Sequence, residues 1–148
     1  ARIAEAYDET RTRQEAFARA MARSFLISAD MAHAIHPNYA DRHDPNHAPL
    51  LGGGPVLKLN VNQAYASDGH TTGRLERWCR RAEVSLQPYV VRSDLPCGST
   101  IGPITAAELG IATVDIGSPL LSMHSIREMA ACADVTLLGR VLDAYFGE

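Results

Sequence analysis

The sequence has few cysteines and no long apolar run, and each absence argues against a class of protein. No stretch of the 148 residues approaches the roughly 20 consecutive apolar residues that a transmembrane helix requires. The three cysteines, Cys79, Cys97 and Cys132, are odd in number and form no C-x-x-C pair. This usage suits a reducing compartment better than a disulfide framework, so we expect a cytoplasmic protein.

A strong net charge is also lacking. The formal net charge is −3, with acidic and basic residues interspersed, so electrostatics give no reason to expect a nucleic-acid or anionic-membrane partner. The charged start of the chain, up to Arg23, does not resemble a secretory signal peptide. Because the chain starts at Ala1 instead of Met and enters a helical pattern at once, we expect it to be part of a longer polypeptide.

The composition and the apolar patterns describe one globular α/β domain. Hydrophobic residues make up 46% and charged residues 21% of the chain, and a chain of this length buries roughly 70% of the surface that its unfolded form exposes. Alternating helices and strands indicate a layered sheet with flanking helices. Apolar periodicity predicts helices at 3–22, 71–83 and 103–109, strands at 25–27, 56–61, 89–91 and 112–116, and a long surface loop at 37–55.

The last helical region is expected to begin at a capping box. Ser125 and Glu128 have the S-x-x-E spacing in which each side chain binds the backbone N–H of the other. The pattern predicts a helical region from Ser125 to about Phe146, with a second cap at Asp134. His124 lies directly before this box, so the box would fix the direction of its side chain.

Asp30 and His124 are the best candidates for metal ligands. Asp30 follows the first predicted strand, and the ligands of open α/β sheets collect beyond the carboxyl ends of strands. A carboxylate and a neutral imidazole at rigid junctions suit Zn²⁺. From position alone two simpler interpretations stay open: Asp30 caps a turn of helix that begins at Met31, and His124 is a polar loop residue.

Four further histidine positions allow a different metal hypothesis. His33, His36, His43 and His47 could together form a structural zinc site, but no cysteine accompanies them and the loop has a flexible composition. We expect instead that His33 alone points into a cleft beside Asp30, while His43 and His47 are solvated.

Lys58 and Tyr65 are candidates for contacts with a substrate. Lys58 interrupts an apolar strand, so its amine either extends to solvent or, if that face lines a pocket, pairs with a substrate carboxylate. Tyr65 either donates a hydrogen bond to a substrate or lies at the edge of the core. The glycine-punctuated segment 98–102 allows close backbone approach to a ligand but lacks the spacing of a phosphate-binding loop.

The candidates amount to half of a metal site. A cocatalytic zinc site needs a bridging carboxylate, further ligands and a general base. The chain supplies two convincing ligand candidates and no pair of adjacent glutamates.

Four segments, 28–38, 54–60, 97–103 and 118–128, together carry a specific resemblance. The chain resembles the C-terminal part of the catalytic domain of the aspartyl aminopeptidase family of dinuclear zinc metallopeptidases, over nearly its whole length and in the same order. The resemblance implies a phosphorylase/hydrolase-like α/β fold. It also implies that residues 1–148 are the C-terminal portion of the catalytic domain, with the upstream half and the inserted dimerisation domain absent.

The resemblance also implies roles for particular residues. Asp30 would bind one zinc ion and His124 the other, while His33, Lys58 and Tyr65 would contact the substrate. The general base would lie upstream, so no catalytic residue is expected in this chain and the isolated chain is expected to be inactive.

The implied activity is the removal of N-terminal residues from peptides, with acidic Asp or Glu favoured because Lys58 is cationic. The complete subunit would hold two Zn²⁺ ions, with Mn²⁺ or Co²⁺ as possible substitutes, and would assemble into a large homo-oligomer. The alternative is a non-catalytic α/β scaffold or binding module in which Asp30 and His124 are structural.

Overall fold

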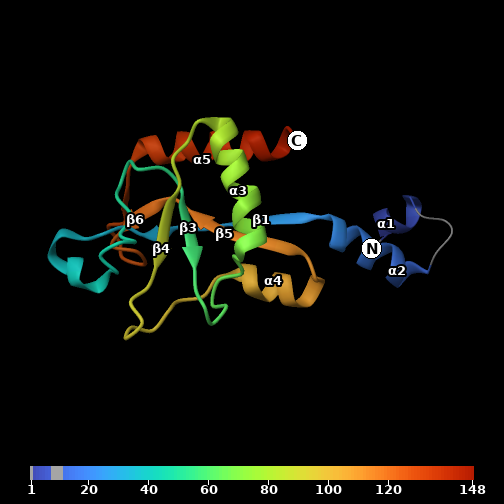
Figure 1. The fold of residues 1–148 in the computed structure, drawn as a ribbon, viewed down its shortest axis with the longest axis horizontal. Coiled ribbons are helices and arrows are strands. Elements are labelled where there is room, and N and C mark those ends of the chain that lie inside the picture. The colour runs from blue at the N-terminus through green and yellow to red at the C-terminus, as the bar shows by residue number, and fades with distance from the viewer. Residues whose placement is uncertain (1, 8–11) are drawn as a thin grey trace.

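A mixed four-stranded sheet forms the centre of the computed structural model, which describes residues 2–7 and 12–148. β5 runs parallel to β1 and antiparallel to β3, and β3 runs parallel to β4. Figure 1 shows the sheet with helices packed around it. This architecture confirms the predicted α/β layered fold. In spatial order the strands are β1 (Phe25–Ala29), β5 (Ala112–Gly117), β3 (Val56–Leu59) and β4 (Gln87–Val90).

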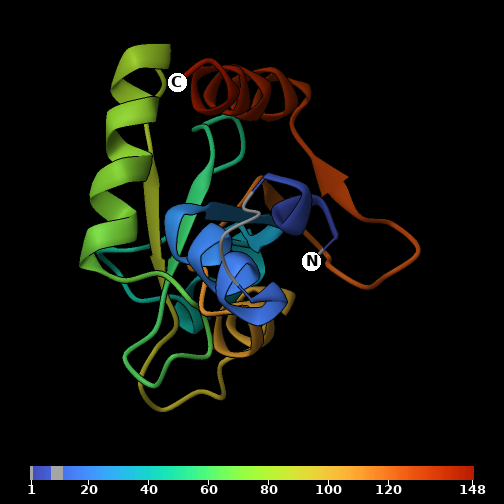
Figure 2. The same ribbon diagram turned by 90° about the vertical axis from the view of Figure 1, so that its right-hand side faces the viewer.

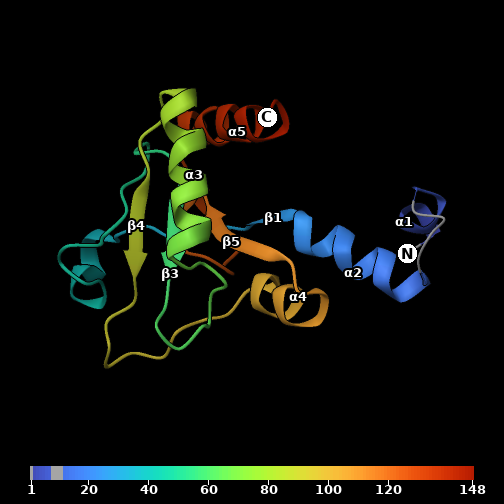
Figure 3. The ribbon, with the colours of Figure 1, turned by 45° about the vertical axis from the view of Figure 1, so that its right-hand side comes forward.

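Two helices cover the main hydrophobic core. α3 (Gly69–Ala82) and α5 (Cys132–Phe146) pack against each other beside the sheet (Figure 3). The ring of Trp78 on α3 lies 5.0 Å from both Phe25 on β1 and Tyr145 on α5, edge to face in each case. The helix expected at 71–83 is therefore confirmed, and its buried face, which includes Leu75, Trp78 and Cys79, fixes it against the strand that leads to Asp30.

A shorter sheet continues from the first one. β2 (Ala32–His33) runs parallel to β6 (Pro119–Leu121), which runs antiparallel to β7 (Met129–Ala130). Because β2 follows β1 and β6 follows β5, the two parallel pairs form one ladder with a break at Asp30.

The N-terminal residues form two helices instead of the single helix expected at 3–22. α1 (Arg2–Tyr7) and α2 (Arg13–Arg23) pack against each other and extend beyond β1 (Figure 1). The single helix is wrong because Thr12 is extended and acts as an N-cap, accepting a hydrogen bond from Glu15 N. The expected helix also ran through residues 8–11, which lie outside the described residues.

The helix expected at Ser125 is also wrong. Glu128 Oε1 accepts a hydrogen bond from His124 N (2.5 Å), and Ser125 Oγ accepts one from Arg127 N (3.0 Å). These bonds close a turn between β6 and β7, so the helix starts only at Cys132. Figure 2 shows this turn extending away from α3.

Smaller differences concern element ends. The strand expected to reach Val61 ends at Leu59, and Val61 is 95% exposed. α4 (Ile101–Leu109) begins two residues before the expected Pro103, after the N-cap Thr100. The predicted loop at 37–55 contains a 3₁₀ helix, η1 (Pro37–Arg42). Within the described residues no helix is long and apolar enough to cross a membrane.

Candidate active site

Asp30 lies at the break between β1 and β2, where the chain crosses Gly117. Asp30 N donates to the carbonyl oxygen of Ile116 (3.0 Å). A side chain at position 117 would collide with the backbone of Asp30, so the close crossing requires glycine there. Asp30 Oδ1 accepts a hydrogen bond from Met31 N (2.7 Å), but strand β2 follows, so the expected helical turn at Met31 is wrong.

Lys58 meets Asp30 from the neighbouring strand β3. Its Nζ lies 3.6 Å from Asp30 Oδ2, and the lysine side chain is 3% exposed whereas that of Asp30 is 59% exposed. Extension of Lys58 to solvent is therefore wrong. Burial lowers the pKa of Lys58, an effect partly opposed by Asp30 and Asp115. The result is a largely desolvated amine that pairs with a solvent-facing carboxylate.

Tyr65 completes this side of the site. Its ring is buried and its centroid lies 5.8 Å from Lys58 Nζ. Burial, and to a smaller extent the neighbouring Cys97, raise the pKa of the phenol well above its usual range. The hydroxyl therefore stays protonated and can donate a hydrogen bond. The segment that begins at Gly98 passes beside this hydroxyl.

Asp115 is a buried carboxylate that the sequence argument missed. It lies on β5 and accepts hydrogen bonds from Ala66 N (2.6 Å) and Thr100 Oγ1 (2.7 Å). Its backbone N–H donates to Ser67 Oγ (2.9 Å). A side chain at Gly102 would collide with this carboxylate. Asp115 therefore ties the segment carrying Tyr65 to the 98–102 loop, and the signal for it was a lone acid within the apolar strand 112–117.

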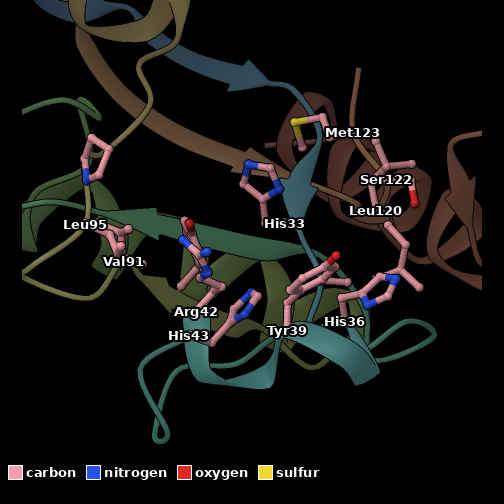
Figure 4. A pocket seen from close by; sticks show the side chains of 14 residues that line it. His33, His36, Tyr39, Arg42, His43, Val91, Leu95, Leu120, Ser122 and Met123 are labelled. Carbon is pink, nitrogen blue, oxygen red and sulfur yellow. The ribbon is translucent and has the colours of Figure 1, made fainter. Parts of the chain in front are cut away.

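His33 lines a cavity on the other side of the site. The cavity has a volume of about 530 Å³ and opens between β2, η1, β4 and the end of β6 (Figure 4). Partial desolvation lowers the pKa of His33, and the nearby His43, His124 and Lys58 lower it further. His33 is therefore a neutral imidazole at neutral pH, as a metal-site or substrate-binding histidine would be. His33 therefore faces a cavity, as expected, but His36 and His43 line it too and Asp30 does not.

The other histidines do not form the all-histidine zinc site. His36 Nδ1 accepts a hydrogen bond from Asn38 N (3.1 Å), and His47 Nδ1 lies 2.6 Å from Asp44 Oδ1. Solvation of His43 is wrong, because both of its ring nitrogens are buried and have no hydrogen-bond partner among the described residues. In residues 2–7 and 12–148 no group of three or more His, Cys, Asp or Glu residues could hold a metal ion.

His124 lies in the turn between β6 and β7. It adopts a left-handed backbone conformation with φ of 67° and is exposed. Its direction is set by the bond from its N–H to Glu128, not by a following helix. His124 is near enough to His33 to contribute to the lowering of the His33 pKa.

The donor set fits part of a zinc site. An exposed carboxylate at Asp30 and an exposed imidazole at His124 are typical zinc ligands. A zinc site takes three or four protein ligands, so further donors are required beyond these two. The mixed sheet places Asp30 beside a buried lysine whose amine lies near a buried tyrosine.

Comparison with known proteins identifies the family. The family described as aminopeptidase I zinc metalloprotease (M18) matches residues 1–146. The chain belongs to this family of zinc metalloproteases, which confirms the resemblance carried by its four segments.

Relatives and solved structures agree with this assignment. A protein from Pseudomonas paraeruginosa named "Probable M18 family aminopeptidase 2" is 56% identical over 132 residues, covering 89% of this chain and 31% of the relative. A crystal structure of yeast aminopeptidase 1 superposes with a TM-score of 0.82 and 30% identity, covering 97% of this chain and 30% of that one. An S. cerevisiae aminopeptidase dodecamer gives a TM-score of 0.79 and 32% identity, with coverage of 89% and 28%. The chain thus spans 31% of the length of the curated relative.

Proposed function

We propose that the complete protein is a zinc-dependent aminopeptidase and that this chain supplies one side of its active site. The observation that carries the proposal is the convergence of Asp30, Lys58 and Tyr65, a metal-type carboxylate beside a desolvated amine and a protonated phenol. Membership of the M18 family supports peptide bonds as the target. Because the chain spans 31% of a relative, the remaining ligands and the general base are expected outside residues 1–148.

Each residue has a role in this proposal. Asp30 and His124 each provide a ligand to one of two zinc ions, for which Mn²⁺ or Co²⁺ could substitute. When bound, the metal centre supplies Lewis acidity and a water of lowered pKa. Lys58 and Tyr65 hold the first residue of the peptide, and His33 contacts the substrate beside Asp30. None of these residues takes the proton from the attacking water.

Lys58 also gives a proposed specificity. A buried amine beside a metal-bound first residue would pair with a carboxylate and leave an uncharged side chain without a partner. We therefore expect peptides that begin with Asp or Glu to be preferred substrates.

The proposed assembly is a large homo-oligomer in the cytoplasm. The structural relative described as a dodecamer, 32% identical to this chain, supports the oligomer. The cysteine usage supports the reducing compartment.

The test is His124→Ala in the complete polypeptide that the gene encodes. Loss of one imidazole ligand is expected to remove one of two zinc ions and to lower kcat/KM by at least about a hundredfold, since even outer-shell changes cost ten- to a hundredfold. Zinc is measured by elemental mass spectrometry, and activity by hydrolysis of aspartyl, glutamyl and leucyl p-nitroanilides.

His47→Ala is the matched control, because its imidazole bonds Asp44 and does not line the cavity. It should retain both zinc ions and full turnover. If His124→Ala also keeps both, His124 is not a ligand. If the unaltered protein binds no zinc and cleaves none of the substrates, the non-catalytic scaffold is the better description.

A further inference from the structure

Tyr89 divides the candidate site into two compartments. Tyr89 is buried on β4 and pairs in register with Lys58 on β3. Its ring centroid lies 6.5 Å from that of Tyr65, 6.5 Å from that of His33 and 6.1 Å from that of His43. His33, His43 and Tyr89 line the cavity of about 530 Å³, whereas Lys58 and Tyr65 do not, so Tyr89 marks the boundary between that pair and the cavity.

The cavity is lined by sequence neighbours of both proposed metal ligands. His33, three residues after Asp30, and Met123, the neighbour of His124, both line it. If Lys58 and Tyr65 hold the first residue of a peptide, the bond to be cleaved lies near Asp30. The peptide that continues beyond this bond then enters the cavity.

Arg42 brings a positive charge to the lining of the cavity. It is the last residue of η1 and lines the cavity, whose lining contains no acidic residue. Figure 4 shows Arg42, His43 and Tyr39 extending from η1 on the side that faces His33. Four other arginines, Arg74, Arg77, Arg80 and Arg92, are each in an ion pair. No ion pair or hydrogen bond of the Arg42 side chain is found among the residues that the structure describes.

His43 provides an independent sign of a missing partner. Both of its ring nitrogens are buried, and neither has a hydrogen-bond partner in the described part of the chain. Buried polar side chains nearly always have such a partner. A ligand group in the cavity could bond His43 and the adjacent Arg42 together.

We propose that this cavity binds the peptide residue that follows the cleaved bond, and that Arg42, assisted by His43, binds a carboxylate there. The inference rests on the proposed aminopeptidase function. The carboxylate is either the C-terminus of a dipeptide or an acidic side chain at the second position. The planar guanidinium can bind either one through two parallel hydrogen bonds.

The experiment uses the complete polypeptide and substrates that share one first residue. The first residue is aspartate, or whichever residue the protein cleaves best. One pair is aspartyl-alanine and its C-terminal amide; the other is aspartyl-glutamate amide and aspartyl-glutamine amide. Aspartyl p-nitroanilide, which has no carboxylate after the bond, measures the peptidase activity by itself.

The carboxylate member of at least one pair should have a kcat/KM about ten- to a hundredfold above its neutral partner. Arg42→Met should abolish that ratio, and an unchanged zinc content and circular dichroism spectrum would show that the variant folds. Arg42→Lys should keep part of the ratio. Arg80→Met, on an exposed face of α3, should keep all of it. A preference within the first pair assigns the terminal carboxylate, and one within the second pair assigns the side chain.

Two results would overturn the inference alone: ratios near one in both pairs, or a ratio that survives in Arg42→Met. In both cases aspartyl p-nitroanilide would still be cleaved, so the aminopeptidase function would stand. Failure of the unaltered, zinc-loaded protein to cleave any of the five substrates would overturn the proposed function, and this inference with it.

Discussion

Lys58 and Tyr65 on one side of Tyr89, and Arg42 and His43 on the other, are held by very different parts of the fold. Lys58 lies on a central strand, and the segment of Tyr65 is bonded to the buried Asp115. Arg42 and His43 belong to a 3₁₀ helix and a loop beside strands of two residues. The first side is therefore preorganised by the core, whereas the second has fewer buried contacts and lower expected local stability.

This comparison suggests a division of labour. The compartment of Lys58 recognises one residue at a fixed position, for which a rigid site is an advantage. The cavity receives the variable remainder of a peptide, for which an adaptable wall suffices. The following predictions test the difference, beginning with the residue expected to matter most for the rigid side.

Asp115→Ala should have the largest effect. It removes the acceptor of Ala66 N and Thr100 Oγ1 and leaves buried Lys58 with less negative charge around it. Each unsatisfied buried donor costs about 1–3 kcal/mol, so we expect a loss of about 3 kcal/mol in the free energy of local unfolding. Amide hydrogen exchange in segments 64–67 and 98–102 measures it.

Asp115→Asn is the matched variant. It keeps the shape of the side chain and one acceptor oxygen, so its loss in the free energy of local unfolding should be smaller. In both variants the amide hydrogen exchange of residues 36–43, on the cavity side, should be nearly unchanged. Equal acceleration on both sides of Tyr89 would show that the two compartments are not separate units.

Lys58→Met should remove the preference for an acidic first residue. Loss of a charge-assisted contact is expected to lower kcat/KM for aspartyl substrates about ten- to a hundredfold relative to leucyl substrates. Asp30 is 59% exposed, so water can solvate its carboxylate and the change in stability should be modest. The ratio of kcat/KM for aspartyl and leucyl p-nitroanilide is the measurement. An unchanged ratio would mean that specificity is set elsewhere.

Asp68→Ala should weaken the rigid side by about 1 kcal/mol, because Asp68 caps α3 directly after the Tyr65 segment. Hydrogen bonding from Thr71 N lowers the pKa of Asp68 below its usual value. In the unfolded chain the pKa of Asp68 is about 4. The contribution of Asp68 to the stability of α3 is therefore fully present above that pH, and it is lost as the pH falls through the lower pKa that Asp68 has in the folded chain.

Asp68→Asn is the control for this pH dependence, since asparagine caps as well as aspartate but does not titrate. Amide exchange at the start of α3, compared at pH 6 and below pH 4, should change less in Asp68→Asn than in the unaltered protein. The same pH dependence in both would exclude Asp68 as its source.

Local patterns predicted most of the fold. The helix expected at 71–83, the helix end expected at 109 and the strand expected at 112–116 depend on residues near in sequence, and all three agree with the structure. The helix at Ser125 failed because Glu128 and Ser125 accept hydrogen bonds from His124 N and Arg127 N within a turn, while Met129 and Ala130 pair with β6. Strand pairing depends on a distant partner, so local spacing could not predict it.

The candidate site was only partly predictable for the same reason. Asp30 follows a strand and so could be placed from sequence alone. The burial and charge environment of Lys58 depend on β4 and on Asp115. The cavity around Arg42 forms only when η1, β4 and the end of β6 come together. A lone acid in an apolar strand was the one sequence signal that could have revealed Asp115.

Glu128→Gln should have the smallest effect, and it tests the adaptable side directly. The charged acceptor of His124 N becomes a neutral one of the same shape, which roughly halves the strength of a hydrogen bond that is exposed to water. We expect faster exchange of the His124 amide by a few-fold and zinc binding weakened by no more than about tenfold. Glu108→Gln, on exposed α4, is the control and should change neither. If Glu128→Gln instead abolished zinc binding, the turn that carries His124 would be as preorganised as the strand that carries Lys58. The contrast between the two sides of Tyr89 would then be wrong.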